Sequence, residues 1–170
     1  MTHRDLCIEV SKWMLDQPWC QLTGWELRYN HGFADVVGLT LKDKDPNKRI
    51  CVAEVKRTRA DLLQDLNKSK LLKYEQGTTH CYLAATPEAL RLDKISEADC
   101  LIDLTKLGLP KKWGVLVIGQ GVRSIRSAYA INKHNSLRAR ALTKRIARSH
   151  MWRQLGTNTG GSISDPEEEC

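Results

Sequence analysis

Two carboxylates and a lysine, Asp35, Glu54 and Lys56, stand at the ends of two apolar runs of this sequence. A gap of 18 residues separates Asp35 from Glu54, and only Val55 separates Glu54 from Lys56. Burying two carboxylates side by side is costly unless their charge is compensated. A divalent cation would compensate it, and two acidic ligands beside a lysine suit Mg²⁺. These three residues therefore predict a magnesium site.

The elements that must bring these residues together form a predicted β-hairpin. The runs 34–41 and 50–56 are β-branched or apolar and have strand length, and the charged segment between them contains proline and asparagine, as turns do. If the turn is symmetric about its midpoint, between positions 45 and 46, Asp35 faces Lys56. Glu54 shares the face of Lys56, because side chains two apart in a strand point the same way.

Further helices and strands are predicted from hydrophobic periodicity and from capping residues. Thr2 with Asp5 begins one helix, and Thr58 with Asp61 begins another, which ends at Gly77. The predicted elements are a helix at 3–16, a strand at 25–29, the hairpin, the helix from 58, a strand at 80–85, a helical segment at 88–92, strands at 100–102, 113–118 and 122–126, and a helix at 136–154. The order αβββαβ at its start predicts an α/β (α+β) fold with a mixed central sheet flanked by helices.

A third carboxylate for the site has two candidates. Glu9 lies one turn before Trp13, at the edge of the apolar stripe of the first helix, from which it would reach the acidic end of the hairpin. A solvated helix glutamate is an equally good interpretation of Glu9. Glu26, on the first predicted strand, is the other candidate. The sequence leaves this choice open, and with it the number of metal ions.

The length of 170 residues suits one domain with its own core, which we expect to span 1–155. The segment 156–170 is rich in Gly, Ser and Thr and then in Glu, which predicts a disordered acidic tail. No apolar run has membrane-spanning length, and no signal-peptide core follows Met1, so we expect a cytoplasmic protein. The six cysteines form no C-x-x-C pair, which predicts buried free thiols rather than a zinc site.

The charge of the chain is unevenly distributed. Residues 1–103 hold 15 Lys and Arg against 16 Asp and Glu, whereas residues 104–164 hold 12 Lys and Arg and no acid. Four acids after position 164 bring the net charge to +7. An acid-free stretch of this length predicts a polyanion as partner. The basic residues of 136–154 scatter around the predicted helix, which argues against a membrane-surface helix.

The pair Ala34-Asp35 and the triplet Glu54-Val55-Lys56 resemble the motif of the PD-(D/E)XK nuclease superfamily, with alanine in place of the proline. The order of the predicted elements around the motif is also similar to the restriction-endonuclease-like core of that superfamily, as in archaeal Holliday junction resolvases. The likeness extends in outline over about residues 3–154.

Bacterial DNA-repair-associated nucleases of this superfamily are the closest resemblance. The segment from Glu54 to Asp61 is similar to them, as are Lys68, Tyr74, the later strands and the Arg-rich last helix. The Q-x-x-x-Y signature of the exonuclease branch is absent, because Gln64 is followed four positions later by Lys68. An endonuclease is therefore the better expectation.

The resemblance implies hydrolysis of DNA phosphodiester bonds, in DNA repair, recombination or phage DNA processing. Asp35 and Glu54 would hold Mg²⁺, or Mn²⁺ in its place, with the Val55 carbonyl as an added ligand. Lys56 would steady the attacking water or the developing negative charge, and Glu9 would complete the catalytic set. The residues that would hold the DNA backbone are Arg57, Arg59 and Lys68 near the metal and, on the basic last helix, Arg138, Arg145 and Arg148.

Two other functions stay open from the sequence. A non-catalytic DNA-binding module would use the same fold, since fold does not fix activity, but the intact set of Asp35, Glu54 and Lys56 argues against it. An accessory or anti-defence protein with a protein partner is the other, and the acid-free stretch argues for nucleic acid instead. A homodimer is suggested only by analogy with junction enzymes. The expected location is the cytoplasm of a bacterial or phage-infected cell.

Overall fold

The computed structural model describes residues 1–29, 32–41, 48–67 and 70–156 of the chain. The predicted order αβββαβ is confirmed by the first elements of the chain, with one 3₁₀-helix added between the second helix and the fourth strand. In chain order the helices and strands are α1 (His3–Leu15), β1 (Leu22–Tyr29), β2 (Gly32–Leu39), β3 (Ile50–Lys56), α2 (Arg59–Asn67), the 3₁₀-helix η1 (Lys70–Tyr74), β4 (His80–Ala85), α3 (Pro87–Leu90), α4 (Glu97–Lys106), β5 (Gly114–Ile118), β6 (Val122–Arg126) and α5 (Ser136–Gly156).

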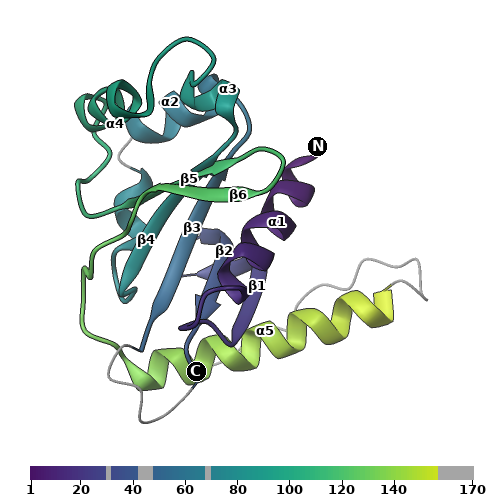
Figure 1. The fold of residues 1–170 in the computed structure, drawn as a ribbon. Helices are drawn as coiled ribbons and strands as arrows, with labels where there is room; N and C mark the ends of the chain where they lie inside the picture. The colour runs from purple at the N-terminus through teal and green to yellow at the C-terminus, as the bar shows by residue number, and fades with distance from the viewer. Residues whose placement is uncertain (30–31, 42–47, 68–69, 157–170) are drawn as a thin grey trace.

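The strands of the described residues form one mixed six-stranded sheet in the spatial order β1-β2-β3-β4-β5-β6 (Figure 1). β1, β2 and β3 pair antiparallel, β3, β4 and β5 pair parallel, and β6 returns antiparallel to β5. Every residue of β3 and β4 is buried except Lys56, as expected for central strands that are covered on both faces. The predicted fold class, a mixed sheet flanked by helices, is confirmed.

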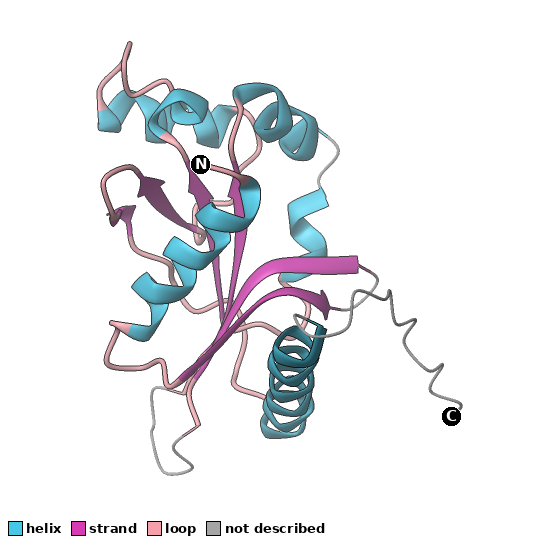
Figure 2. Cartoon of the chain, turned by 90° about the vertical axis from the view of Figure 1, so that its right-hand side faces the viewer, coloured by secondary structure: helices cyan, strands magenta, loops and turns pink. Residues whose placement is uncertain are grey.

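The helices are divided unequally between the two faces of the sheet (Figure 2). On one face α1 buries Leu6, Val10 and Met14 against strand residues that include Ala53 and Leu116. The opposite face is covered by α2, η1, α3, α4 and α5. The buried apolar residues that these helices contribute to that second core include Leu62, Leu66, Leu90, Leu104, Leu142 and Ile146.

Capping residues start α1 and α2 where the sequence predicts. The Asp5 N–H donates to the Thr2 hydroxyl at 3.2 Å, and the Thr2 N–H donates to the Asp5 carboxylate at 2.7 Å. The Asp61 N–H donates to the Thr58 hydroxyl at 3.2 Å. Each cap satisfies donors that the first turn of a helix leaves free, so α2 begins directly after β3.

The register of the β2–β3 hairpin differs from the prediction by two residues. Val36 lies opposite Ala53 in the ladder, so continuing the same register places Asp35 opposite Glu54 rather than opposite Lys56. The prediction placed the midpoint of the hairpin one residue too far along the chain. A shift of two residues keeps every side chain on its own face of the sheet, whereas a shift of one would have reversed the faces.

The predicted strand at 100–102 is wrong, because these residues belong to α4. The Ser96 hydroxyl accepts from the Asp99 N–H at 3.2 Å and caps this helix. Cys100 and Leu104, four residues apart, are buried, whereas Ile102 between them is 54% exposed. A short apolar run such as 100–102 suits a strand, but the buried residues of this segment follow the four-residue spacing of a helix.

The helix predicted from Thr58 to Gly77 is divided in the structure into α2 and η1. The last helix begins at Ser136 as predicted, but the residue that caps it is Asn135, whose side-chain oxygen accepts from the Arg138 N–H at 3.0 Å. Residues 157–170 of the predicted tail lie outside the described residues. The domain bounds 1–155 therefore stay a prediction.

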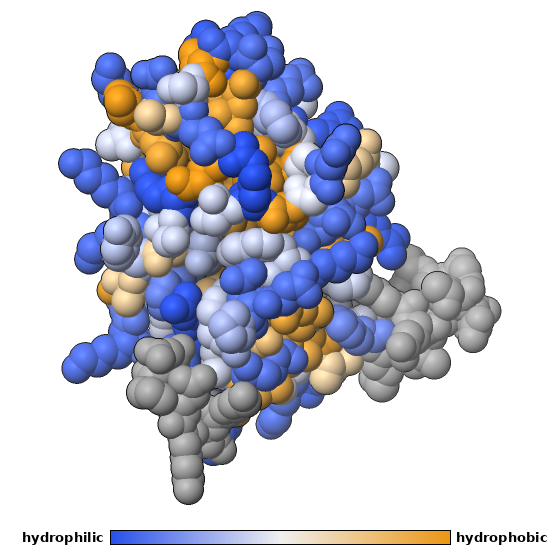
Figure 3. Space-filling view, viewed as in Figure 1, coloured by the Kyte–Doolittle hydropathy of each residue, from blue (hydrophilic) through white to orange (hydrophobic). Residues whose placement is uncertain are grey.

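The surface in the view of Figure 1 is mostly hydrophilic, and hydrophobic residues gather toward its upper end, where α2, α3 and α4 lie (Figure 3). Among the described helices none combines the length and the apolar character needed to cross a bilayer.

Candidate active site

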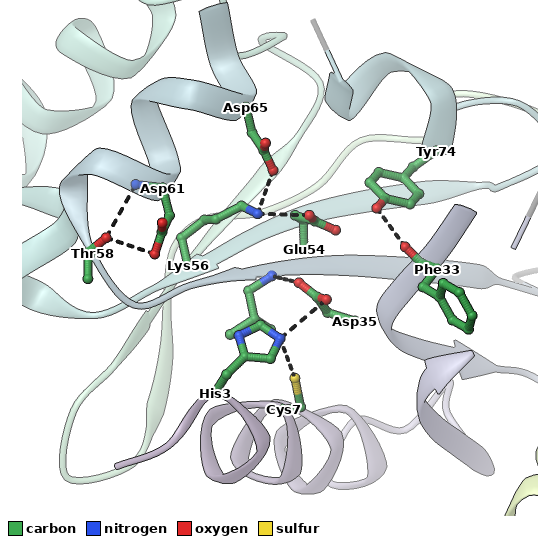
Figure 4. A network of polar contacts seen from close by, with 11 residues as sticks. His3, Cys7, Phe33, Asp35, Glu54, Lys56, Thr58, Asp61, Asp65 and Tyr74 are labelled. Carbon is green, nitrogen blue, oxygen red and sulfur yellow. Dashed lines mark hydrogen bonds and ion pairs between the residues drawn. The ribbon is translucent and has the colours of Figure 1, made fainter. Parts of the chain in front are cut away.

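The β2–β3 ladder ends where Asp35 and Glu54 would face each other. Its last pair is Val36 with Ala53. Beyond that pair the Val55 N–H donates to Oδ2 of Asp35 at 2.7 Å (Figure 4). The carboxylate thus accepts the hydrogen bond that a backbone carbonyl of β2 would accept in a continuing ladder. The end of the ladder thus gives Asp35 a fixed place beside β3.

Lys56 is held between two carboxylates. Its ammonium lies 2.9 Å from Oε1 of Glu54 and 2.5 Å from Oδ2 of Asp65, which comes from α2 (Figure 4). The side chains of all three are at most 11% exposed. At this depth an ion pair is screened little by solvent, so the position of the ammonium is strongly constrained.

Glu54 is 6% exposed, and its Oε2 has no hydrogen-bond partner among the described residues. The Tyr74 hydroxyl of η1 lies close by but donates to the Phe33 carbonyl at 2.8 Å. A hydroxyl has one proton to donate, so this bond leaves Oε2 of Glu54 without a full partner. A buried carboxylate oxygen without a donor is costly, which makes it a place where a bound cation would be stabilising.

His3, in the first turn of α1, reaches the same cluster. Its Nε2 lies 3.3 Å from Oδ1 of Asp35 and 3.5 Å from Sγ of Cys7 (Figure 4). The hydrogen bond to Asp35 raises the pKa of His3 above its ordinary value. Both oxygens of Asp35 are therefore oriented, one by α1 and the other by β3.

Burial and charge act in opposite directions on the groups of this cluster. Burial raises the pKa of Glu54, and the charge of Asp35 raises it further, whereas Lys56 lowers it. Burial on its own would lower the pKa of Lys56, but Glu54 and Asp65 outweigh it and the pKa rises. Burial, together with the charge of Glu54, also raises the pKa of Tyr74. Lys56 is thus a charged ammonium at neutral pH, and Tyr74 keeps its proton.

A cavity of about 320 Å³ opens beside the cluster, and His3, Lys56, Arg57 and Asp65 are among the residues that line it. A larger cavity of about 450 Å³ lies between α4 and β6, and its lining includes Ile102 but no carboxylate. The charged groups of the smaller cavity make it the better candidate for a reaction site.

The two candidates for a third carboxylate differ in their surroundings. Glu9 pairs with Lys12 on α1 at 2.8 Å, so the structure does not support its predicted catalytic role. Glu26 is exposed and falls opposite Asp35 in the β1–β2 register, with a φ of 52° that is unusual for a residue other than glycine. In the described part of the chain no group of three His, Cys, Asp or Glu side chains is arranged to hold a metal ion.

The basic residues predicted near the metal divide into different environments. Arg57 is exposed at the cavity. Arg59 instead donates to Asp103 of α4 at 2.6 Å and ties α2 to that helix, which gives it a structural role rather than the predicted phosphate contact. Lys68 lies outside the described residues.

The three arginines predicted on the last helix also differ. Arg138 stacks on the Tyr29 ring, with its guanidinium carbon 4.5 Å from the ring centroid, and so serves packing. Arg145 is exposed and donates to the Arg28 carbonyl at 3.1 Å. Arg148 is exposed. Arg145 and Arg148 therefore place positive charge on the surface of α5.

Sequence reasoning missed His3, Asp65 and Tyr74. One signal was available for Asp65: it lies three residues after Leu62 and beside Leu66, on the buried side of α2, and a buried acid predicts a partner. His3 and Tyr74 carry no such local signal, because only the packing of α1 and η1 on the sheet brings them to the site.

No protein-family model matches the sequence, and no curated protein matches it. A solved structure of a protein of unknown function from Silicibacter pomeroyi shares the fold, with a TM-score of 0.67 at 20% sequence identity over 97% of this chain and 99% of that one. A second solved structure, of SfsA from Pyrococcus furiosus in complex with Ca²⁺, has a TM-score of 0.34 at 11% identity over 72% of this chain and 60% of that one. A likeness as weak as the second carries no argument about function.

Proposed function

We propose that the protein is a metal-dependent DNA endonuclease of the PD-(D/E)XK kind, with Asp35, Glu54 and Lys56 at its centre. The observation that carries the proposal is the placement of Asp35 and Glu54 at the end of the β2–β3 ladder, close enough for the charge of Asp35 to raise the pKa of Glu54. Oε2 of Glu54 is buried there, and the neighbouring Tyr74 hydroxyl donates to the Phe33 carbonyl instead. The Lys56 ammonium is held beside Glu54 by contacts of 2.9 Å to Glu54 and 2.5 Å to Asp65.

The donor set suits Mg²⁺, with Mn²⁺ as a substitute. Asp35 and Glu54 would hold the ion, and the Val55 carbonyl is directed toward them. The Lys56 carbonyl accepts from Thr86 on the β4 side at 3.2 Å, and carbonyls of successive strand residues point to opposite neighbours, so that of Val55 points toward β2. Two carboxylates suffice, because Mg²⁺ usually keeps several waters.

A bound Mg²⁺ supplies Lewis-acid polarisation of a phosphate oxygen and an acidified water. Lys56 contributes a fixed positive charge next to the negative charge that develops on phosphate. Its raised pKa makes it a poor general base, since it holds its proton at neutral pH. His3 and the Val55 N–H orient Asp35 from two sides.

DNA as the partner is supported by charge. The 61 residues of 104–164 carry 12 basic side chains and no acid, and exposed members such as Arg140, Lys144 and Arg148 lie on α5. Arg57 adds a positive charge at the cavity itself. Phosphate contacts of this kind supply affinity that does not depend on sequence.

A non-catalytic DNA-binding module is the second candidate, and one observation favours it. Lys56 already forms ion pairs with both Glu54 and Asp65, and the described residues contain no three-ligand metal group. In that case the cluster would stabilise the end of the sheet without performing a reaction.

One assay separates the two functions. The protein is incubated with linear, nicked and junction DNA in Mg²⁺ or Mn²⁺, and Glu54→Gln is compared with the matched substitution Glu9→Gln. We expect cleavage by the wild type, a loss of at least about 100-fold in Glu54→Gln, and an unchanged rate in Glu9→Gln. DNA binding without cleavage of any substrate would favour the binding module, and equal rates in both variants would refute the site.

A further inference from the structure

Phe33 presents an exposed aromatic ring beside the candidate site. It is 64% exposed, although the strand residues from Val36 to Leu39 are buried. It stands two positions before Asp35, and its carbonyl accepts from the Tyr74 hydroxyl at 2.8 Å. Figure 4 shows the ring pointing away from the charged cluster. The backbone of Phe33 is thus tied to the site while its side chain faces outward.

Basic groups from two elements, β1 and α5, lie near this ring. Arg28 of β1 lies opposite Phe33 in the ladder and is exposed, and directly opposed residues have neighbouring side chains. Arg145 of α5 reaches the same place through its bond of 3.1 Å to the Arg28 carbonyl. Arg28 and Arg145 thus bring positive charge to the strand position opposite the exposed ring.

We propose that Phe33 stacks on an unpaired nucleobase next to the phosphate that is cut, so that DNA with unpaired bases is the preferred substrate class. This inference rests on the proposed endonuclease function. An aromatic ring stacks on any base, and positive groups beside it hold the backbone. The bases of a paired duplex stack on one another and would have to be unstacked before they could reach the ring. The surrounding positive charge favours DNA over an apolar protein surface as the occupant.

The test compares two labelled DNAs of the same length and sequence, one fully paired and the other with a short gap of unpaired bases. Binding of the full chain is measured by fluorescence anisotropy in EDTA. Phe33→Ala should weaken binding to the gapped DNA about tenfold and leave binding to the paired DNA unchanged. Phe33→Trp, which can still stack, should keep the affinity. Tyr129→Ala removes another exposed aromatic ring, 66% exposed, and should behave like the wild type.

Several outcomes would overturn the stacking role. They are wild-type affinity of Phe33→Ala for the gapped DNA, equal losses on both DNAs, and an equal loss in Tyr129→Ala. The same DNAs are then incubated with Mg²⁺ to test the endonuclease function separately. Binding that depends on Phe33 without any cleavage would refute the endonuclease and leave the stacking role standing. If instead the wild type and Phe33→Ala cleave the gapped and the paired DNA at equal rates, the endonuclease function stands and the stacking role is refuted.

Discussion

The imidazole of His3 and the carboxylate of Asp35 meet where α1 crosses the start of β2, with 3.3 Å between Nε2 and Oδ1. The other oxygen of Asp35 accepts from the Val55 N–H at 2.7 Å. Donors from two elements thus fix one carboxylate, and the docking of α1 on the sheet helps to shape the candidate site.

Replacing His3 tests this relationship. His3→Ala should lower the single-turnover cleavage rate at saturating Mg²⁺ by about 10- to 100-fold, as expected when a partner that orients a ligand is lost. His3→Gln, whose amide can still donate to Asp35, should recover part of that rate. Equal rates in the wild type and both variants would show that the Val55 N–H alone is sufficient to orient Asp35.

Replacing Asp65 tests the position of Lys56. Asp65→Asn removes the nearer of the two charges on the ammonium, so the cleavage rate should fall by about 10- to 100-fold. Affinity for Mg²⁺, measured by calorimetry, should not change, because Asp65 is not a proposed ligand. The free energy of unfolding should fall by about 1–3 kcal/mol. Asp93→Asn, at an exposed position, is the matched control. A loss of Mg²⁺ affinity in Asp65→Asn would make Asp65 a ligand.

The arginines of α5 should separate into two kinds. Arg138→Ala should lower the melting temperature by about 2–4 °C for each 1 kcal/mol of lost packing on Tyr29. The double substitution Arg145→Ala and Arg148→Ala, at exposed positions, should lower stability less than Arg138→Ala does. It should instead make the salt dependence of DNA binding shallower, since each phosphate contact contributes roughly −0.9 to the slope of log K against log salt. A slope identical to that of the wild type would place the DNA away from α5.

Acid should destabilise the protein partly through His80. Burial lowers the pKa of His80 from 6.5 to about 4, and the charge of Arg49 acts in the same direction. The unfolded chain therefore takes up this proton first as the pH falls, so stability decreases between about 6.5 and about 4. Urea unfolding at pH 7 and pH 5 should show a larger loss in the wild type than in His80→Gln. Parallel losses would mean that His80 binds its proton equally well in the folded and the unfolded state.

The sequence was sufficient to predict the strands that carry the motif, since residues 34–41, most of which lie in β2, and residues 50–56, which form β3, are β-branched or apolar runs. It was also sufficient for the meeting of Asp35 and Glu54, because only the parity of the register decides the face of a strand. The register itself was wrong by two residues, since sequence alone does not reveal where a turn is centred.

The rest of the site depends on tertiary packing. Asp65 and Tyr74 reach Glu54 and Lys56 only because α2 and η1 fold back over β3. Glu9 was a candidate because it stood at the edge of an apolar stripe, but Lys12, three residues later, offered a nearer partner. Local pattern thus located the two central carboxylates, and contacts between distant elements supplied the residues that orient them.

The two faces of the sheet divide the described thiols of the protein between two compartments. Cys7, Cys20 and Cys51 are buried beneath α1, whereas Cys81 and Cys100 are buried in the core on the other side. Alkylating reagents reach a buried thiol only during local opening. The rate at which Cys51 is alkylated therefore measures how often α1 lifts from the sheet, and each such event also separates His3 from Asp35. The alkylation rate of Cys51 thus reports how often the candidate site comes apart, and the measurement needs no substrate.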